Sequence, residues 1–126
     1  MSKIISWGSA RTFTVWQYGI GHSQLLLSGR GTGTEPDLGV HFEGVEFMRL
    51  IRVFRNLRIA TADEHHIREI ENSGIPSLRP LLMLALHHDE GVGLVACSRL
   101  RIGQTPANGK PTWNLTDIQL HASATG

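Results

Sequence analysis

Short segments of strand-forming residues, most of them followed by glycine- or proline-containing stretches, recur along the chain and restrict it to a β-rich fold. Residues 11–18 and 22–28 are two such segments, separated by a glycine-containing turn, and they predict an antiparallel hairpin. Residues 38–43 alternate apolar with polar or small side chains, which is typical of a strand with one buried face. The alternation predicts that His41 and Glu43 point together toward solvent or a cleft.

Two further segments contain helical signals. Residues 44–58 carry a helical stripe of apolar side chains and also an alternation of the strand type, so helix and strand both stay open there. Thr61 and Glu64 have the spacing of a capping box. This spacing predicts a short helix over 62–72 with Thr61 as its N-cap.

A second hairpin is predicted around residues 89–91. Its arms are the apolar run 81–86 and the segment 93–102. Leucine, methionine and alanine favour helices, so a helix over 77–88 is the alternative for the first arm. We favour the strand, because a strand buried on both faces shows the same continuous apolar run.

These elements fit a single domain over residues 1–126, because independent folding units are commonly about 100 to 150 residues long. Residues 113–120 alternate as a last strand, and residues 121–126 are expected to form a frayed tail. The predicted fold class is mainly β, an antiparallel β-sandwich or a partly open β-barrel with one short helix. The alternative is an α+β fold with a second helix near 77–88.

Charge and cysteine content limit the partners and the compartment. Twelve basic and eleven acidic side chains leave a net charge of +1, so the chain lacks the overall basic field of a non-specific nucleic-acid binder. The single cysteine, Cys97, cannot form an intramolecular disulfide, which favours a reducing, cytoplasmic location. The longest apolar run, 81–86, is far shorter than the roughly 20 residues that span a bilayer, so no membrane association is expected.

Seven histidines raise the question of a metal site, but their spacing argues against one. The spacings His-x-His and His-x-x-x-His do not occur, and adjacent histidines at 65–66 and 87–88 diverge on either a strand or a helix. Whether these two pairs, each flanked by acids, meet in space stays open. The chain also lacks a Gly-x-Ser-x-Gly motif, and Cys97 lies within a predicted strand. We expect no metal, no cofactor and no catalytic residue, and favour a binding domain over an enzyme.

Four residues are candidates for ligand binding: His22, His41, Glu43 and Trp7. Trp7 lies next to a glycine near the N-terminus and is the aromatic best suited to a surface contact, whereas Trp16 lies among other large apolar residues and is expected to be partly structural. Arg30 lies in a glycine-rich loop and would contact an anion if that loop closed over a site.

Four arginines within one short stretch form an alternative, nucleic-acid site: Arg49, Arg52, Arg55 and Arg58. Neither a helix nor a strand places all four on one face. A solvated surface, with arginines paired to nearby acids, is therefore the favoured interpretation, and nucleic-acid binding is not our leading expectation.

Three segments resemble a family of small bacterial β-rich proteins of unknown function: VWQYGIGHSQLLL at 15–27, FEGVEFM at 42–48 and LVACSRL at 94–100. The resemblance extends over most of the chain. It implies a compact all-β fold in a bacterial cytoplasm, and it brings no catalytic residues to this sequence.

The leading functional hypothesis is a non-enzymatic domain that binds another protein or a small ligand. One alternative is a small metal- or ligand-binding barrel enzyme that uses His22, His41 and Glu43. The other is nucleic-acid binding through the arginines of 49–58. Pairing of exposed sheet edges in a homodimer stays open.

Overall fold

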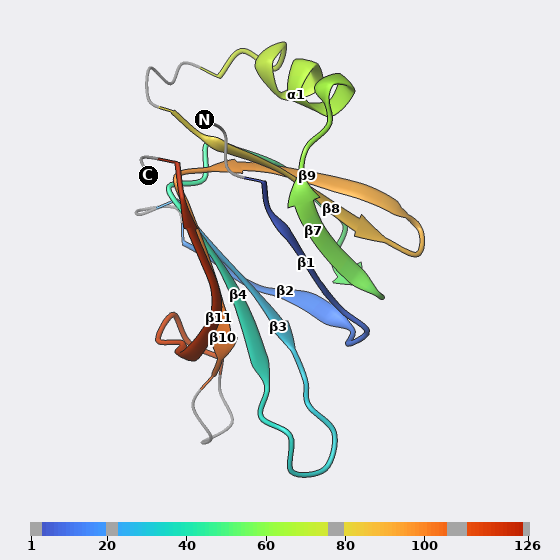
Figure 1. Ribbon diagram of the computed structural model, residues 1–126, viewed down its shortest axis with the longest axis vertical. Coiled ribbons are helices and arrows are strands. Elements are labelled where there is room, and N and C mark those ends of the chain that lie inside the picture. The colour runs from blue at the N-terminus through green and yellow to red at the C-terminus, as the bar shows by residue number, and fades with distance from the viewer. Residues whose placement is uncertain (1–3, 20–22, 76–79, 106–110, 125–126) are drawn as a thin grey trace.

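The computed structural model describes residues 4–19, 23–75, 80–105 and 111–124, which form two antiparallel sheets and one helix (Figure 1). The five-stranded sheet has the order β1 (Ser6–Ser9), β7 (Leu57–Thr61), β8 (Leu82–His88), β9 (Gly91–Cys97), β5 (Phe47–Arg49). The six-stranded sheet has the order β11 (Thr116–Ser123), β10 (Arg99–Gln104), β4 (Leu38–Glu43), β3 (Gln24–Gly29), β2 (Phe13–Gly19), β6 (Val53–Phe54). The prediction of a mainly-β sandwich with one short helix is confirmed, and neither sheet closes into a barrel within these ranges.

The main core lies between the two sheets and is filled by alternate residues of their strands. Leu27 of β3 and Phe42 of β4 meet Leu84 of β8 and Val95 of β9, and all four are fully or almost fully buried. Burial of each such side chain stabilises the fold by roughly 1.5–3 kcal/mol. The alternation of β4 is thus confirmed on its inner face, and the outer faces of the sheets are left for other contacts.

The helix α1 (Glu64–Glu71) covers the outer face of the five-stranded sheet, where its buried Ile70 belongs to a second cluster of packed apolar residues. Its N-cap is Asp63, whose Oδ1 accepts from the backbone N–H of His66 at 2.8 Å. The prediction of Thr61 as the cap is wrong, because Thr61 ends β7 and its Oγ1 accepts from the N–H of Ile5 at 2.9 Å. Aspartate at the next available position supplies the cap instead.

The hairpin predictions are confirmed. Antiparallel β2 and β3 form the first hairpin, and β8 and β9 form the second, around a turn at Asp89 and Glu90. The alternative helix over 77–88 is wrong for residues 82–88, which pair with strands on both sides, while residues 76–79 lie outside the described ranges. Residues 44–58, left open by the sequence, hold the short strands β5 and β6 and the start of β7.

The predicted single strand 93–102 is divided at Ser98, where the chain passes from one sheet to the other. The neighbouring connection from β4 to β5 also changes sheets, at Gly44. Both the N–H and the Oγ of Ser98 donate to the carbonyl of Glu43, at 2.9 and 3.0 Å. Gly44 has a φ of +63°, and a Cβ at this position would collide with Ser98 Oγ. The two crossings are therefore packed tightly against each other.

The C-terminal part of the chain is more ordered than the sequence suggests. Strand β11 runs to Ser123. Residues 121–123, which were expected to belong to a frayed tail, pair with Arg101, Leu100 and Arg99 of β10. The side chain of Ala122 is buried in the core, which explains why the strand continues. Of the helices in the part of the chain that is described, none has the length and apolar character needed to cross a membrane.

Candidate functional site

The outer face of the six-stranded sheet is partly covered by the segment 111–115, which leads into β11. Gly39 of β4 and Gly103 of β10 are directly paired, and the absence of side chains on both makes room for Leu115. A Cβ at Gly39 would lie 2.5 Å from Leu115 Cδ2, and one at Gly103 would lie 3.3 Å from Leu115 Cβ. Trp113 of the same segment stacks on His41, with ring centroids 4.9 Å apart.

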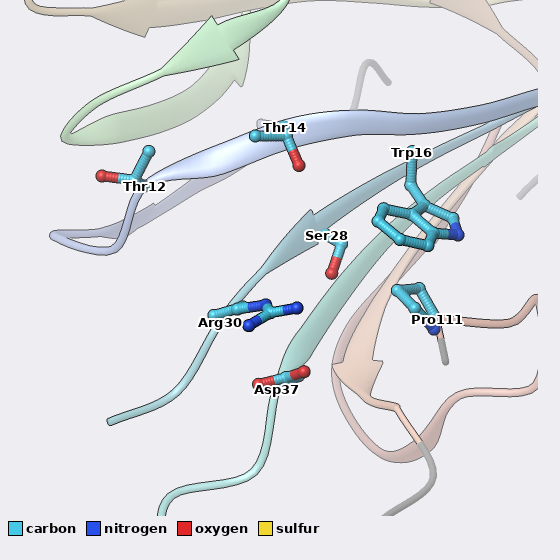
Figure 2. Close-up of a pocket in the computed structure, with 7 residues that line it drawn as sticks. All are labelled: Thr12, Thr14, Trp16, Ser28, Arg30, Asp37 and Pro111. Carbon is cyan, nitrogen blue, oxygen red and sulfur yellow. The ribbon is translucent and has the colours of Figure 1, made fainter. Parts of the chain in front are cut away.

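A pocket of about 250 Å³ lies on this face beside the covering segment (Figure 2). Seven residues line it: Thr12, Thr14, Trp16, Ser28, Arg30, Asp37 and Pro111. Figure 2 shows the Trp16 ring and Pro111 at one end and the Arg30 and Asp37 side chains at the other, with the Ser28 hydroxyl between them. The pocket thus has an aromatic, apolar end and a polar, charged end.

Trp16 follows Thr14 by two positions and lies on the same outer face of β2, and the strand has a bulge at this point. Val15 pairs with Leu27 and Gln17 pairs with Leu26, so Trp16 is an extra residue with no partner of its own in the register. A bulge of this kind bends the strand and redirects a side chain. Trp16 is 51% exposed, so only part of its side chain is packed against the protein.

The polar end is held by the base of the connection between β3 and β4. Asp37 Oδ1 accepts from the N–H of Gly31 at 2.8 Å, and Arg11 donates to the carbonyl of Pro36 at 2.7 Å. Gly31 fits closely against this turn, since a Cβ there would collide with the carbonyl of Glu35. These contacts hold the backbone of the turn next to Arg30, which directly follows β3.

The side chains at the polar end keep hydrogen-bonding capacity. Arg30 forms no ion pair or hydrogen bond with any residue in the described ranges, and neither does the hydroxyl of Ser28. Ser28 as a whole is only 6% exposed, yet it lines the pocket. Together with Oδ2 of Asp37, these groups offer donors and acceptors to a molecule in the pocket.

The predicted pair His41 and Glu43 is brought together next to the pocket, on the same outer face, but His41 is only 2% exposed. Its Nδ1 lies 3.7 Å from Glu43 Oε1 and 3.5 Å from an Arg101 nitrogen, and its Nε2 lies 3.2 Å from Gln24 Oε1. Burial lowers the pKa of His41, and the Glu43 carboxylate opposes this effect. Of the two surroundings that the alternation allowed, solvent or a cleft, His41 does not face solvent, because Trp113 covers it.

The other two candidate ligand-binding residues do not join this pair. Trp7 of β1 lies between the sheets, where its ring packs edge-on against Phe13 at 6.0 Å and its Nε1 donates to Gln119 at 3.3 Å. His22 lies outside the described residues. The pocket is lined instead by residues that the sequence reading did not assign to a site, apart from Arg30.

The four arginines of 49–58 lie on different elements. Arg49 in β5 forms an ion pair with Glu69 of α1 at 2.6 Å, and Arg55 forms one with Glu90 of the β8–β9 turn at 3.3 Å. Arg58 belongs to β7, and Arg52 lies in the connection before β6. Two of the four positive charges are thus paired with carboxylates.

The two histidine pairs approach each other where α1 begins next to β8. His66 Nδ1 lies 2.9 Å from Asp63 Oδ1. Burial lowers the pKa of His87, the charges of Arg58 and His66 lower it further, and Asp63 raises it. Among the described residues, no three His, Cys, Asp or Glu side chains are placed to hold a metal ion.

Cys97 belongs to the core and not to a reactive site. It is fully buried in β9, and burial raises its pKa to about 12. A thiol in this state is protonated at neutral pH and is a poor nucleophile.

A second hollow, of about 370 Å³, opens between the sheets beside β2 and β5. Its lining is mainly apolar: Val15, Tyr18, Leu25, Met48, Leu50, Ile51 and Arg52. It offers few polar groups that would orient a polar molecule, in contrast to the pocket at Trp16.

No protein-family model, curated protein or solved structure matches this chain. The signal for the pocket at Trp16 in the sequence was weak: a tryptophan in a strand and one arginine in a glycine-rich loop.

Proposed function

We propose that this chain is a non-enzymatic domain that binds a small polar molecule in the pocket between Trp16 and Arg30. The observation that carries the proposal is that Arg30 and the Ser28 hydroxyl, neither of which has a hydrogen-bond partner among the described residues, line one pocket with the half-exposed indole of Trp16. Ligand sites combine an apolar wall with a few placed polar groups in this way. The groups stand on strands of a packed sheet, which limits their movement.

The lining supports binding better than catalysis. Its titratable side chains, among the described residues, are Arg30 and Asp37. Acid and base catalysis usually needs a pair of groups that exchange a proton near neutral pH. His41 packs against Trp113 of the covering segment and also contacts Gln24 and Glu43.

We rank nucleic-acid binding and a metal-dependent enzyme below ligand binding. The arginines of 49–58 are spread over several elements and two are paired with carboxylates. A cytoplasmic location is proposed on the single buried thiol, which suits a reducing compartment.

Thermal unfolding tests this function. A molecule that binds only the folded state at about tenfold its Kd adds about 1.4 kcal/mol, or about 5 °C in Tm for a domain of this size. We expect at least one class among neutral sugars, amino acids and phosphorylated metabolites to raise the Tm, and Arg30→Ala to remove most of the shift. Arg55→Ala, which changes an exposed arginine elsewhere, should keep it.

A panel in which no compound changes the Tm would contradict the proposed function. Equal shifts in the wild type and in Arg30→Ala would contradict the assignment to this pocket.

A further inference from the structure

We propose that the molecule bound in the pocket is a neutral carbohydrate, with one pyranose ring placed between Trp16 and the polar end. This inference rests on the proposed function and names the ligand class for the same site. It depends on three properties of the pocket: its aromatic wall, its mixture of donors and acceptors, and its balanced charge.

The aromatic wall suits the C–H face of a sugar ring. Half of the Trp16 surface is exposed, and its side chain lines the pocket on the same face as Thr14. The face of an aromatic ring carries partial negative charge, and the C–H bonds on one side of a pyranose meet it favourably. Pro111 adds apolar surface at the same end (Figure 2).

The polar end suits the hydroxyls at the rim of the same ring. Each sugar hydroxyl both donates and accepts, so it needs neighbours of both kinds. Arg30 supplies a planar fork of donors that can reach two adjacent oxygens, and Asp37 Oδ2 supplies an acceptor. The hydroxyl of Ser28, which has no partner among the described residues, either donates or accepts. Figure 2 shows these three groups along one side of the pocket.

The charge of the lining favours a neutral ligand. Arg30 and Asp37 carry opposite charges, and the remaining lining residues are uncharged. A phosphate or a sugar acid would be attracted by Arg30 and repelled by Asp37. An amino acid would pair with both charges, but such ion pairs contribute little at a site open to water. It would also leave the hydroxyls of Thr12, Thr14 and Ser28 without hydrogen-bond partners on the ligand.

The volume limits how much of the ligand enters. About 250 Å³ is below the 300–1,000 Å³ of typical drug-sized sites, so the pocket accommodates one ring and not a whole oligosaccharide. Trp16 is half exposed, so its ring can also contact a neighbouring sugar unit outside the pocket. A short neutral oligosaccharide is therefore the best probe.

Isothermal titration calorimetry tests the ligand class with four neutral trisaccharides: maltotriose, cellotriose, triacetylchitotriose and mannotriose. Glutamine, glucose phosphate and a galacturonic acid trimer are the zwitterionic and anionic comparators. We expect saturable binding of at least one neutral trisaccharide, and weaker or no binding of the comparators.

Matched variants locate the binding. Trp16→Ala should weaken the affinity by about tenfold or more, and Trp16→Phe, which keeps an aromatic face, should retain most of it. Asp37→Asn should weaken the affinity by several-fold, because a charged acceptor is replaced by a neutral one. Arg55→Ala should leave it unchanged. Amide NMR spectra of each variant show whether the fold is retained.

The outcomes separate the two proposals. If no neutral trisaccharide binds but a comparator does and needs Arg30, the carbohydrate inference is overturned and the proposed function stands. If a trisaccharide binds with the same affinity to Trp16→Ala, the inference is also overturned. If no probe of any class binds, both proposals fail.

Discussion

At the scale of single residues, the alternation at 38–43 predicts the face on which His41 lies but not the burial of its side chain. The pattern of 38–43 correctly placed His41 and Glu43 on one face. It did not reveal that Trp113, seventy-two positions further along the chain, would stack on that face and bury the imidazole. Contacts of this kind depend on the path of a distant segment and leave no local periodicity.

Burial of His41 predicts a pH-dependent stability. Its pKa is lowered from the ordinary value of 6.5, mainly by burial. The unfolded chain therefore binds a proton more readily than the folded one, so the free energy of unfolding should fall as the pH drops through 6.5 toward the lower folded pKa. Urea unfolding of His41→Gln across this range should give a flatter profile than the wild type.

Two further variants complete the pH measurement. His87 also has a lowered pKa, so His87→Gln separates its contribution from that of His41. His121→Gln changes an exposed histidine and serves as the control. An unchanged profile in His41→Gln would contradict the account of a buried neutral imidazole.

At the scale of elements, most strands follow from local patterns and the exceptions have physical causes. The hairpins of β2 with β3 and of β8 with β9 agree with the alternation and the turn residues. The strand predicted over 93–102 is divided because its two halves belong to different sheets, and the division rests on the contact of Ser98 with Glu43. The bulge in β2 inserts Trp16 as an extra residue, so the two-residue period is broken after this position.

Because the two crossings pack tightly, alanine should destabilise the fold more at Gly44 than at a glycine with open space around it. Gly44 and Gly33 have the same φ of +63°, so both substitutions carry the left-handed penalty of roughly 1–2 kcal/mol. At Gly44 the new Cβ also collides with Ser98 Oγ, whereas nothing lies within 4 Å at Gly33. Gly44→Ala should therefore destabilise the fold by roughly 1–3 kcal/mol more than Gly33→Ala, measured by urea unfolding.

Ser98→Gly in the Gly44→Ala background should recover part of this difference, because it removes the colliding atom. Equal destabilisation by Gly44→Ala and Gly33→Ala would show that the crossings are not packed as described.

At the scale of the whole molecule, the pocket at Trp16 lies on a face that no single segment builds. Residues of β2, of the connection between β3 and β4, and of the segment before β11 meet there only after the six-stranded sheet has formed. This explains why the fold class was predictable from the sequence and the site was not. Strand patterns are local, whereas the pocket needs a pair of glycines under Leu115 and a covering segment from the far end of the chain.

The most direct test of binding at Trp16 is a map of amide NMR shifts on titration with the compound that raises the Tm most. The account predicts saturable shifts at Thr14, Ser28, Gly31 and Asp37 and at the indole N–H of Trp16. Shifts confined to the apolar hollow at Tyr18, Met48 and Ile51, or no saturable shift at all, would contradict it.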